Sequence, residues 1–120
     1  MTKSKKEIGQ TGEDLAVTHL TQKGYRVVER NYRHPRGEID IIAKDGTVLC
    51  FIEVKMRQSD RLGHPFEAIT LAKQRQISRM AERYLQAHRI TDVPCRFDVL
   101  AITWDSSGPN FDLLKNAFEY

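Results

Sequence analysis

The fold of this chain is decided by two stretches, GEIDIIA at residues 37–43 and VLCFIEVKMR at residues 48–57. Both are rich in the β-branched and aromatic residues that favour strands. The dipeptide Asp45-Gly46 between them is a strong signal for a tight turn that joins antiparallel strands. Each stretch carries an acid within its apolar run, Asp40 in the first and Glu53 in the second. The sequence therefore predicts a β-hairpin with a carboxylate embedded in each strand.

These two acids are unusual because apolar strands indicate a sheet that is covered on both faces. A carboxylate in such a place is costly unless it is paired or binds a metal. Side chains alternate along a strand, so Glu53 and Lys55 share one face. If the hairpin register aligns that face with Asp40, two acids and a lysine converge. The alternatives are a surface ion pair between Glu53 and Lys55, and an Asp40 that only satisfies turn amides.

Two converging carboxylates fit a hard divalent cation such as Mg²⁺ or Mn²⁺. Such cations take oxygen ligands and often bind only one or two protein carboxylates, together with water and substrate phosphate. Lys55 can hold or polarise an attacking water, or offset negative charge in a phosphoryl-transfer transition state. The pattern thus predicts a catalytic centre made of Asp40, Glu53 and Lys55.

Working outward from the hairpin, periodicity and turn residues predict the remaining elements. In chain order we expect a helix over 7–23 that stops at Gly24, strands over 25–32, 38–43 and 48–57, a helix from Pro65 to about His88, a strand over 96–103, a loop over 105–110 and a last strand or tail over 111–118. A helix between the third and fourth strands allows a crossover to a parallel strand. The prediction is a mixed α/β sheet flanked by helices.

Length and composition set the frame for this fold. The chain has 120 residues and a formal charge of +3, which suits a single domain over 1–120 with a flexible basic tail at 1–6. No apolar run reaches the roughly 20 residues of a membrane helix, and the basic N-terminus lacks the apolar segment of a secretory signal. Cys50 and Cys95 lie in apolar strand-like runs, so we expect buried thiols in a reducing cytoplasm.

Basic residues surround the predicted centre along the chain. Arginine and lysine suit phosphate recognition, and a row of arginines four residues apart forms one stripe on a helix. The candidate nucleic-acid-binding residues are Arg57, Arg61, Lys73, Arg75, Arg79 and Arg83. The alternative for those on the second helix is a solvated face without a ligand.

The motifs GEID at 37–40 and EVK at 53–55 resemble those of the PD-(D/E)XK nuclease superfamily. Over about residues 9–118 the chain is further similar to the bacterial YraN family, which itself resembles archaeal Holliday-junction resolvases. The other motifs that carry this resemblance are Gly12-Glu13, Gly24-Tyr25, Arg30-Asn31, Met56-Arg57 and Arg96-Phe97-Asp98. One departure is Ile39, which precedes Asp40 where many superfamily members have proline.

The resemblance implies a restriction-endonuclease-like core and a role for each matching residue. It implies that Asp40, Glu53 and the backbone carbonyl of Val54 bind the metal and that Lys55 is the catalytic lysine. It also implies that Glu13, on the first helix, contributes an acid near the metal, with a solvent-facing side chain as the alternative.

The expected function is a metal-dependent endonuclease that hydrolyses DNA phosphodiester bonds. The resolvase likeness implies branched DNA and a two-fold dimer. A module that keeps the fold and binds nucleic acid without cutting is the alternative, and a structural or protein-interaction domain is a third. The roles of two further acids are not decided by the sequence. Glu38 is either a neighbour of the centre or a cap of the turn. Asp98 lies in an apolar strand and needs a partner, which we expect to be an arginine.

Overall fold

The computed structural model describes residues 5–57 and 69–119, with side chains from residue 11 onward in the first range. Its elements follow the order α1 (Lys5–Gln22), β1 (Arg26–His34), β2 (Gly37–Asp45), β3 (Val48–Arg57), α2 (Leu71–Ala87), β4 (Cys95–Asp105) and β5 (Gly108–Phe118). The strands form one sheet in the order β1-β2-β3-β4-β5. Among the described strands, β3 and β4 form the one parallel pair and the others are antiparallel. The predicted mixed sheet with a helical crossover is therefore confirmed.

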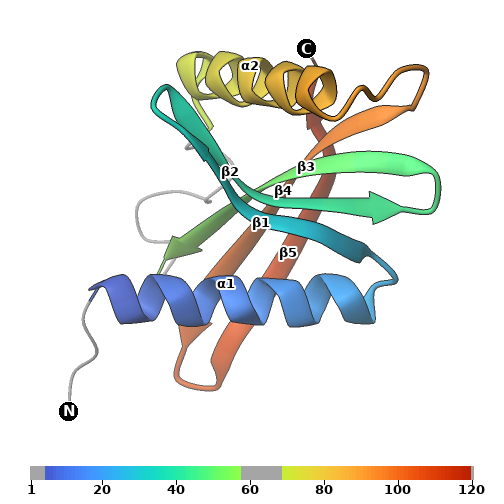
Figure 1. The fold of residues 1–120 in the computed structure, drawn as a ribbon. Coiled ribbons are helices and arrows are strands. Elements are labelled where there is room, and N and C mark those ends of the chain that lie inside the picture. Colours follow the sequence, from blue (N-terminus) through green and yellow to red (C-terminus); the bar gives the residue numbers. More distant parts are fainter. Residues whose placement is uncertain (1–4, 58–68, 120) are drawn as a thin grey trace.

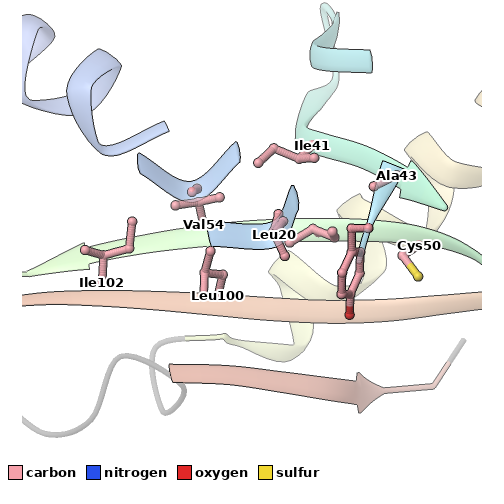
Figure 2. Close-up of a cluster of buried hydrophobic side chains, with 10 residues drawn as sticks. Leu20, Ile41, Ala43, Cys50, Val54, Leu100 and Ile102 are labelled. Carbon is pink, nitrogen blue, oxygen red and sulfur yellow. The ribbon is translucent and has the colours of Figure 1, made fainter. Parts of the chain in front are cut away.

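The two helices cover opposite faces of the sheet (Figure 1). On the α1 face, Ala16 and Leu20 pack against strand residues that include Ile52, within a cluster that Figure 2 shows in close-up. On the α2 face, Ile77 and Tyr84 pack against a second cluster. The neighbouring residues of Ile52, among them Phe51, point to the α2 side, so β3 is buried on both faces, as its apolar run predicts.

The second helix begins later than predicted. Ile69 and Thr70 are not helical, and Thr70 is the N-cap of α2: its side-chain oxygen accepts a hydrogen bond from the Lys73 backbone N–H at 3.1 Å. A threonine at this position satisfies one of the free N–H groups of the first turn, which fixes the start of the helix. The predicted start at Pro65 lies outside the described residues.

The C-terminal hairpin and the N-terminal tail also differ from the prediction. β5 begins at Gly108 rather than Phe111, because Ser106 and Ser107 alone form the turn and Gly108 adopts a φ of 115° that suits the strand entry. Residues 5 and 6, assigned to a tail, are the first residues of α1.

The two thiols occupy different environments. Cys50 is buried in the α1-side cluster, and burial raises its pKa to about 12. Cys95 is exposed, so the prediction of a buried thiol is wrong there: it is the first residue of β4 and lies at the rim of the sheet. Within the described residues, neither helix is long and apolar enough to cross a membrane.

Candidate active site

Strands β2 and β3 separate at the two predicted acids, Asp40 and Glu53, and this point of separation is called the fork. The ladder between β2 and β3 runs as far as Ile41 opposite Ile52, and the same register continued by one residue places Asp40 opposite Glu53. There the Val54 backbone N–H donates to Oδ2 of Asp40 at 2.7 Å. A side chain thus takes the place of a strand partner, and beyond this point β2 and β3 diverge (Figure 1).

Each arm of the fork is held by a different helix. The start of β2 lies against α2, where Gln76 Nε2 donates to the Arg36 carbonyl at 3.0 Å and a Cβ on Gly37 would overlap the Gln76 side chain. The end of β3 lies against α1, where a Cβ on Gly12 would collide with Met56. Glycine at both positions allows these close approaches. The two helices therefore keep the strands apart at the acids.

Glu53 is a buried acid with two lysines near one of its carboxylate oxygens. It is only 7% exposed, and its Oε1 lies 3.7 Å from Lys55 Nζ and 3.6 Å from Lys73 Nζ. Its Oε2 is buried and has no hydrogen-bond partner among the described residues. The ion pair between Glu53 and Lys55 is therefore present, as the alternative proposed, but Glu53 is buried and the pair does not lie on the surface. A second lysine also reaches this acid, from the first turn of α2.

Asp40 is a buried acid whose pKa is raised to about 7. Burial is the largest cause, because it disfavours the charged carboxylate, and the negative charge of Glu53 is the next. The hydrogen bond from Val54 opposes the rise, while Glu38 and Glu13 add to it. Near neutral pH this fork therefore holds an acid that is readily protonated and can also be neutralised by a cation.

The donor set at the fork fits a hard divalent cation. Asp40 and Glu53 bring carboxylate oxygens from adjacent strands, and one of them, Glu53 Oε2, has no hydrogen-bond partner in the described part of the chain. An extended residue directs its N–H and C=O to the same neighbouring strand, so the Val54 carbonyl lies on the same side as the N–H that binds Asp40. Among the described residues, no group of three or more His, Cys, Asp or Glu side chains could hold a metal. The fit is thus to a cation with two carboxylates, a carbonyl, water and phosphate oxygens.

Glu13 approaches the fork from α1. It is half-buried, its Oε2 accepts a hydrogen bond from Asn31 Nδ2 at 3.1 Å, and its charge contributes to the raised pKa of Asp40. Its neighbour Asp14 is exposed and pairs with Arg30. Of these two consecutive acids on α1, Glu13 is therefore the one directed toward the strands and near the site.

Asp98 is a buried acid with a structural role, and its carboxylate differs from that of Glu53 in its hydrogen bonds. It is fully buried and accepts hydrogen bonds from Tyr25, from two nitrogens of Arg96 and from the Asn116 backbone N–H. The predicted arginine partner is confirmed, and the carboxylate is saturated. Glu38, by contrast, accepts from Arg33 across the β1–β2 hairpin at 3.1 Å, and its charge contributes to the raised pKa of Asp40.

The predicted basic residues occupy different positions around the fork. Lys73 contacts Glu53, and Arg57 is half-buried at the end of β3. The α2 stripe of Arg75, Arg79 and Arg83 is exposed, and these arginines form no ion pair within the described part of the chain. Arg61 lies outside the described residues.

Beside Lys73 lies a groove that the sequence did not predict. It is a cavity of about 440 Å³ between the β1–β2 turn and α2, lined by residues that include Arg33, His34, Arg36, Glu38, Lys73 and Gln76. Asn31 was also missed as a neighbour of the site. Its signal was an asparagine inside a strand, a residue that strands disfavour and that tolerates a left-handed backbone.

Fold and fork together define the class: a mixed α/β protein with a core of the restriction-endonuclease-like kind. Comparison with known proteins then makes the family specific. The chain belongs to the uncharacterised protein family UPF0102, whose family model matches residues 12–102. This is the YraN family that the sequence motifs resemble.

Relatives in this family cover most of the chain. A UPF0102 protein of Chlorobium phaeobacteroides (strain BS1) is 56% identical over 96 residues, which is 80% of this chain and 76% of the relative. A UPF0102 protein of Geobacter metallireducens is 45% identical over 119 residues, or 99% of this chain and 98% of the relative. One of Chlorobium limicola is 52% identical over 99 residues, or 82% and 77%.

Proposed function

We propose that this protein is a metal-dependent endonuclease that hydrolyses DNA phosphodiester bonds. The proposal depends chiefly on Glu53 Oε2, a buried oxygen without a hydrogen-bond partner among the described residues, opposite the acid Asp40 in the strand register. Buried carboxylates are normally saturated, as Asp98 is here. An unsatisfied one beside a second acid with a perturbed pKa favours a functional site.

The side chains of the fork suit phosphodiester hydrolysis. Mg²⁺ or Mn²⁺, held by Asp40, Glu53 and the Val54 carbonyl, would supply Lewis-acid stabilisation of the phosphate charge. Lys55 Nζ, 3.7 Å from Glu53 Oε1, places an N–H donor beside the acids, where it orients water and stabilises negative charge. The water loses one proton to solvent as its oxygen bonds to phosphorus, the bond to the departing sugar oxygen breaks, and that oxygen takes up a proton.

The basic residues supply the means to hold the substrate backbone. The exposed α2 stripe offers three guanidinium groups without ion pairs in the described structure, and the groove beside Lys73 adds Arg36. Such groups bind phosphates without reading sequence and make the affinity salt-dependent. The likeness to resolvases supports branched DNA as substrate, and a junction with two cleavage points suits a two-fold dimer; both steps are analogies at the level of the fold.

Cleavage of end-labelled DNA tests the proposal. Single-stranded, duplex, flapped and four-way-junction substrates are incubated with Mg²⁺ or Mn²⁺, using the wild type, Asp40→Asn, Glu53→Gln and, as a matched control, Asp92→Asn. Asp92 is exposed in the loop before β4, so its change should leave cutting intact. We expect metal-dependent cutting that is lost in both fork variants.

The same assay separates the alternatives. Binding to any substrate without cutting would favour a non-catalytic nucleic-acid module, for which the exposed α2 stripe is the supporting observation. If the protein neither binds nor cuts any of these substrates, the nucleic-acid function is refuted. Cutting that persists in Asp40→Asn would show that the fork is not the active site.

A further inference from the structure

We propose that Asn31 is a positioning residue: it turns the β1–β2 hairpin at the fork and holds Glu13 beside Asp40. The inference deepens the proposed function and depends on it for the identity of the site. Asn31 does not belong to the predicted catalytic set. It lies on β1, one strand away from the nearer acid.

The strand register places Asn31 in line with both acids. Arg30 pairs with Ile41 and Tyr32 with Ile39, so Asn31 stands opposite Asp40. Asp40 in turn stands opposite Glu53 across the fork. Asn31 and the two acids therefore form one row across three strands.

At this row the regular alternation of β2 is interrupted. Residues two apart on a strand normally share a face. Ile41 packs in the cluster on the α1 side, whereas Ile39 packs in the cluster on the α2 side. The strand therefore changes its orientation at Asp40, between these two residues.

β1 changes its orientation at the same row. Arg30 pairs with Asp14 of α1 at 2.6 Å, whereas Tyr32 makes an edge contact with Tyr84 of α2, with ring centroids 5.3 Å apart. Between them Asn31 adopts a φ of 52°, in the left-handed region that few residues other than glycine and asparagine adopt readily. The left-handed residue coincides with the turn of the hairpin toward α2, which opens the fork.

Besides the backbone of Asn31, its side-chain amide also makes a contact near the fork. Its Nδ2 donates to Glu13 Oε2 at 3.1 Å, and this is the hydrogen bond that fixes the half-buried acid of α1. The backbone and the amide of one residue thus set both the direction of β2 and the place of Glu13. Glycine at 31 keeps the left-handed backbone but removes the amide, which separates these two effects.

The contact is tested first without metal. In amide NMR spectra, the side-chain NH₂ signals of Asn31 are assigned by their loss in Asn31→Gly. We expect Glu13→Gln to shift them, because a charge-assisted hydrogen bond becomes a neutral one. Asp92→Asn, the same loss of one negative charge at an exposed position in the loop before β4, is the control and should leave them in place.

The positioning role is tested by Mn²⁺ titration calorimetry on a double-mutant cycle. We expect Asn31→Gly to weaken Mn²⁺ binding by about the same factor as Glu13→Gln, roughly 10-fold, because Glu13 is a charged neighbour of the ligand Asp40 and is not itself a ligand. We expect the double variant with Glu13→Gln to bind no more weakly than Glu13→Gln alone, because Asn31 acts through Glu13. A general loss of structure would not produce this coupling.

The outcomes distinguish this inference from the proposed function. Asn31 signals that do not respond to Glu13→Gln, or losses of affinity that multiply in the double variant, overturn the role of Asn31. A wild type that binds no Mn²⁺ overturns the metal centre instead, whatever the spectra show.

Discussion

Replacing Asp40 by asparagine should stabilise the metal-free protein, and more so at high pH. Asp40 has an ordinary pKa of 3.8 and a pKa of about 7 in the fold. Between these values the native state keeps a proton that the unfolded chain has lost, so stability falls as the pH rises. Above about pH 7 Asp40 is ionised in both the native and the unfolded state. The native state then carries the full free-energy cost of a buried charge beside Glu53.

The size of the effect follows from these two pKa values. One pKa unit corresponds to about 1.4 kcal/mol, so the raised pKa of Asp40 lowers the free energy of unfolding by roughly 2 kcal/mol at pH 5, where the native state must keep the proton, and by roughly 4 kcal/mol at pH 8.5, where it must bury the charge. Asparagine keeps an oxygen that can accept the Val54 N–H and carries no charge. The advantage of Asp40→Asn over the wild type should therefore grow by roughly 2 to 3 kcal/mol from pH 5 to pH 8.5.

Urea unfolding in EDTA at the two pH values measures this difference. Asp92→Asn, at an exposed loop position, is the control and should show no growth with pH. An Asp40→Asn variant whose advantage is the same at pH 5 and pH 8.5 would refute the argument, since Asp40 would then not carry a raised pKa. A variant less stable than the wild type at both values would show that the carboxylate is already paired in the fold.

Three further predictions concern other parts of the molecule. In thermal scans at pH 8, Mn²⁺ at 100 times its Kd should stabilise the wild type by about 2.7 kcal/mol and leave Asp40→Asn unchanged; equal stabilisation of both would place the metal elsewhere. In urea unfolding, Asp98→Asn should lower the free energy of unfolding by on the order of 3 kcal/mol, because it breaks a buried ion pair. Asp45 is half-buried, so Asp45→Asn should lower it by under about 1 kcal/mol. Similar losses in the two variants would contradict this ranking. The third variant replaces the three arginines of the α2 stripe, Arg75, Arg79 and Arg83, by alanine. In fluorescence anisotropy at several salt concentrations, it should bind DNA more weakly, and the slope of log affinity against log salt concentration should become shallower by up to about 3. An unchanged slope would exclude the stripe from the interface.

The sequence alone determined the central strands and the identity of the buried acids. The apolar runs around Asp40 and Glu53, together with the turn at Asp45-Gly46, specify a hairpin because strand periodicity and turn chemistry are local properties. The helix between β3 and β4 likewise implied the parallel pair. The start of α2 was misjudged because Pro65 and Thr70 are both favourable helix starts, and local sequence does not rank them.

Only the tertiary structure decided which acid is structural and which is free. Asp40, Glu53 and Asp98 look alike in sequence, each an acid within an apolar strand. Asp98 is saturated by partners up to 73 positions away in the chain, whereas one oxygen of Glu53 has no hydrogen-bond partner among residues 5–57 and 69–119. Hydrogen-bond saturation depends on which distant groups the fold brings within about 3 Å, and local patterns carry no such information.

The fork itself also depends on tertiary structure. Gly12 and Gly37 are 25 positions apart, yet each lets a different helix approach a different strand, and Asn31 turns the hairpin between them. The sequence placed the acids on neighbouring strands because side-chain alternation and register follow from a short turn. The separation of those strands, and the arrival of Glu13 and Lys73 from opposite faces, were decided by the packing of two helices, because packing joins residues that are remote in the chain.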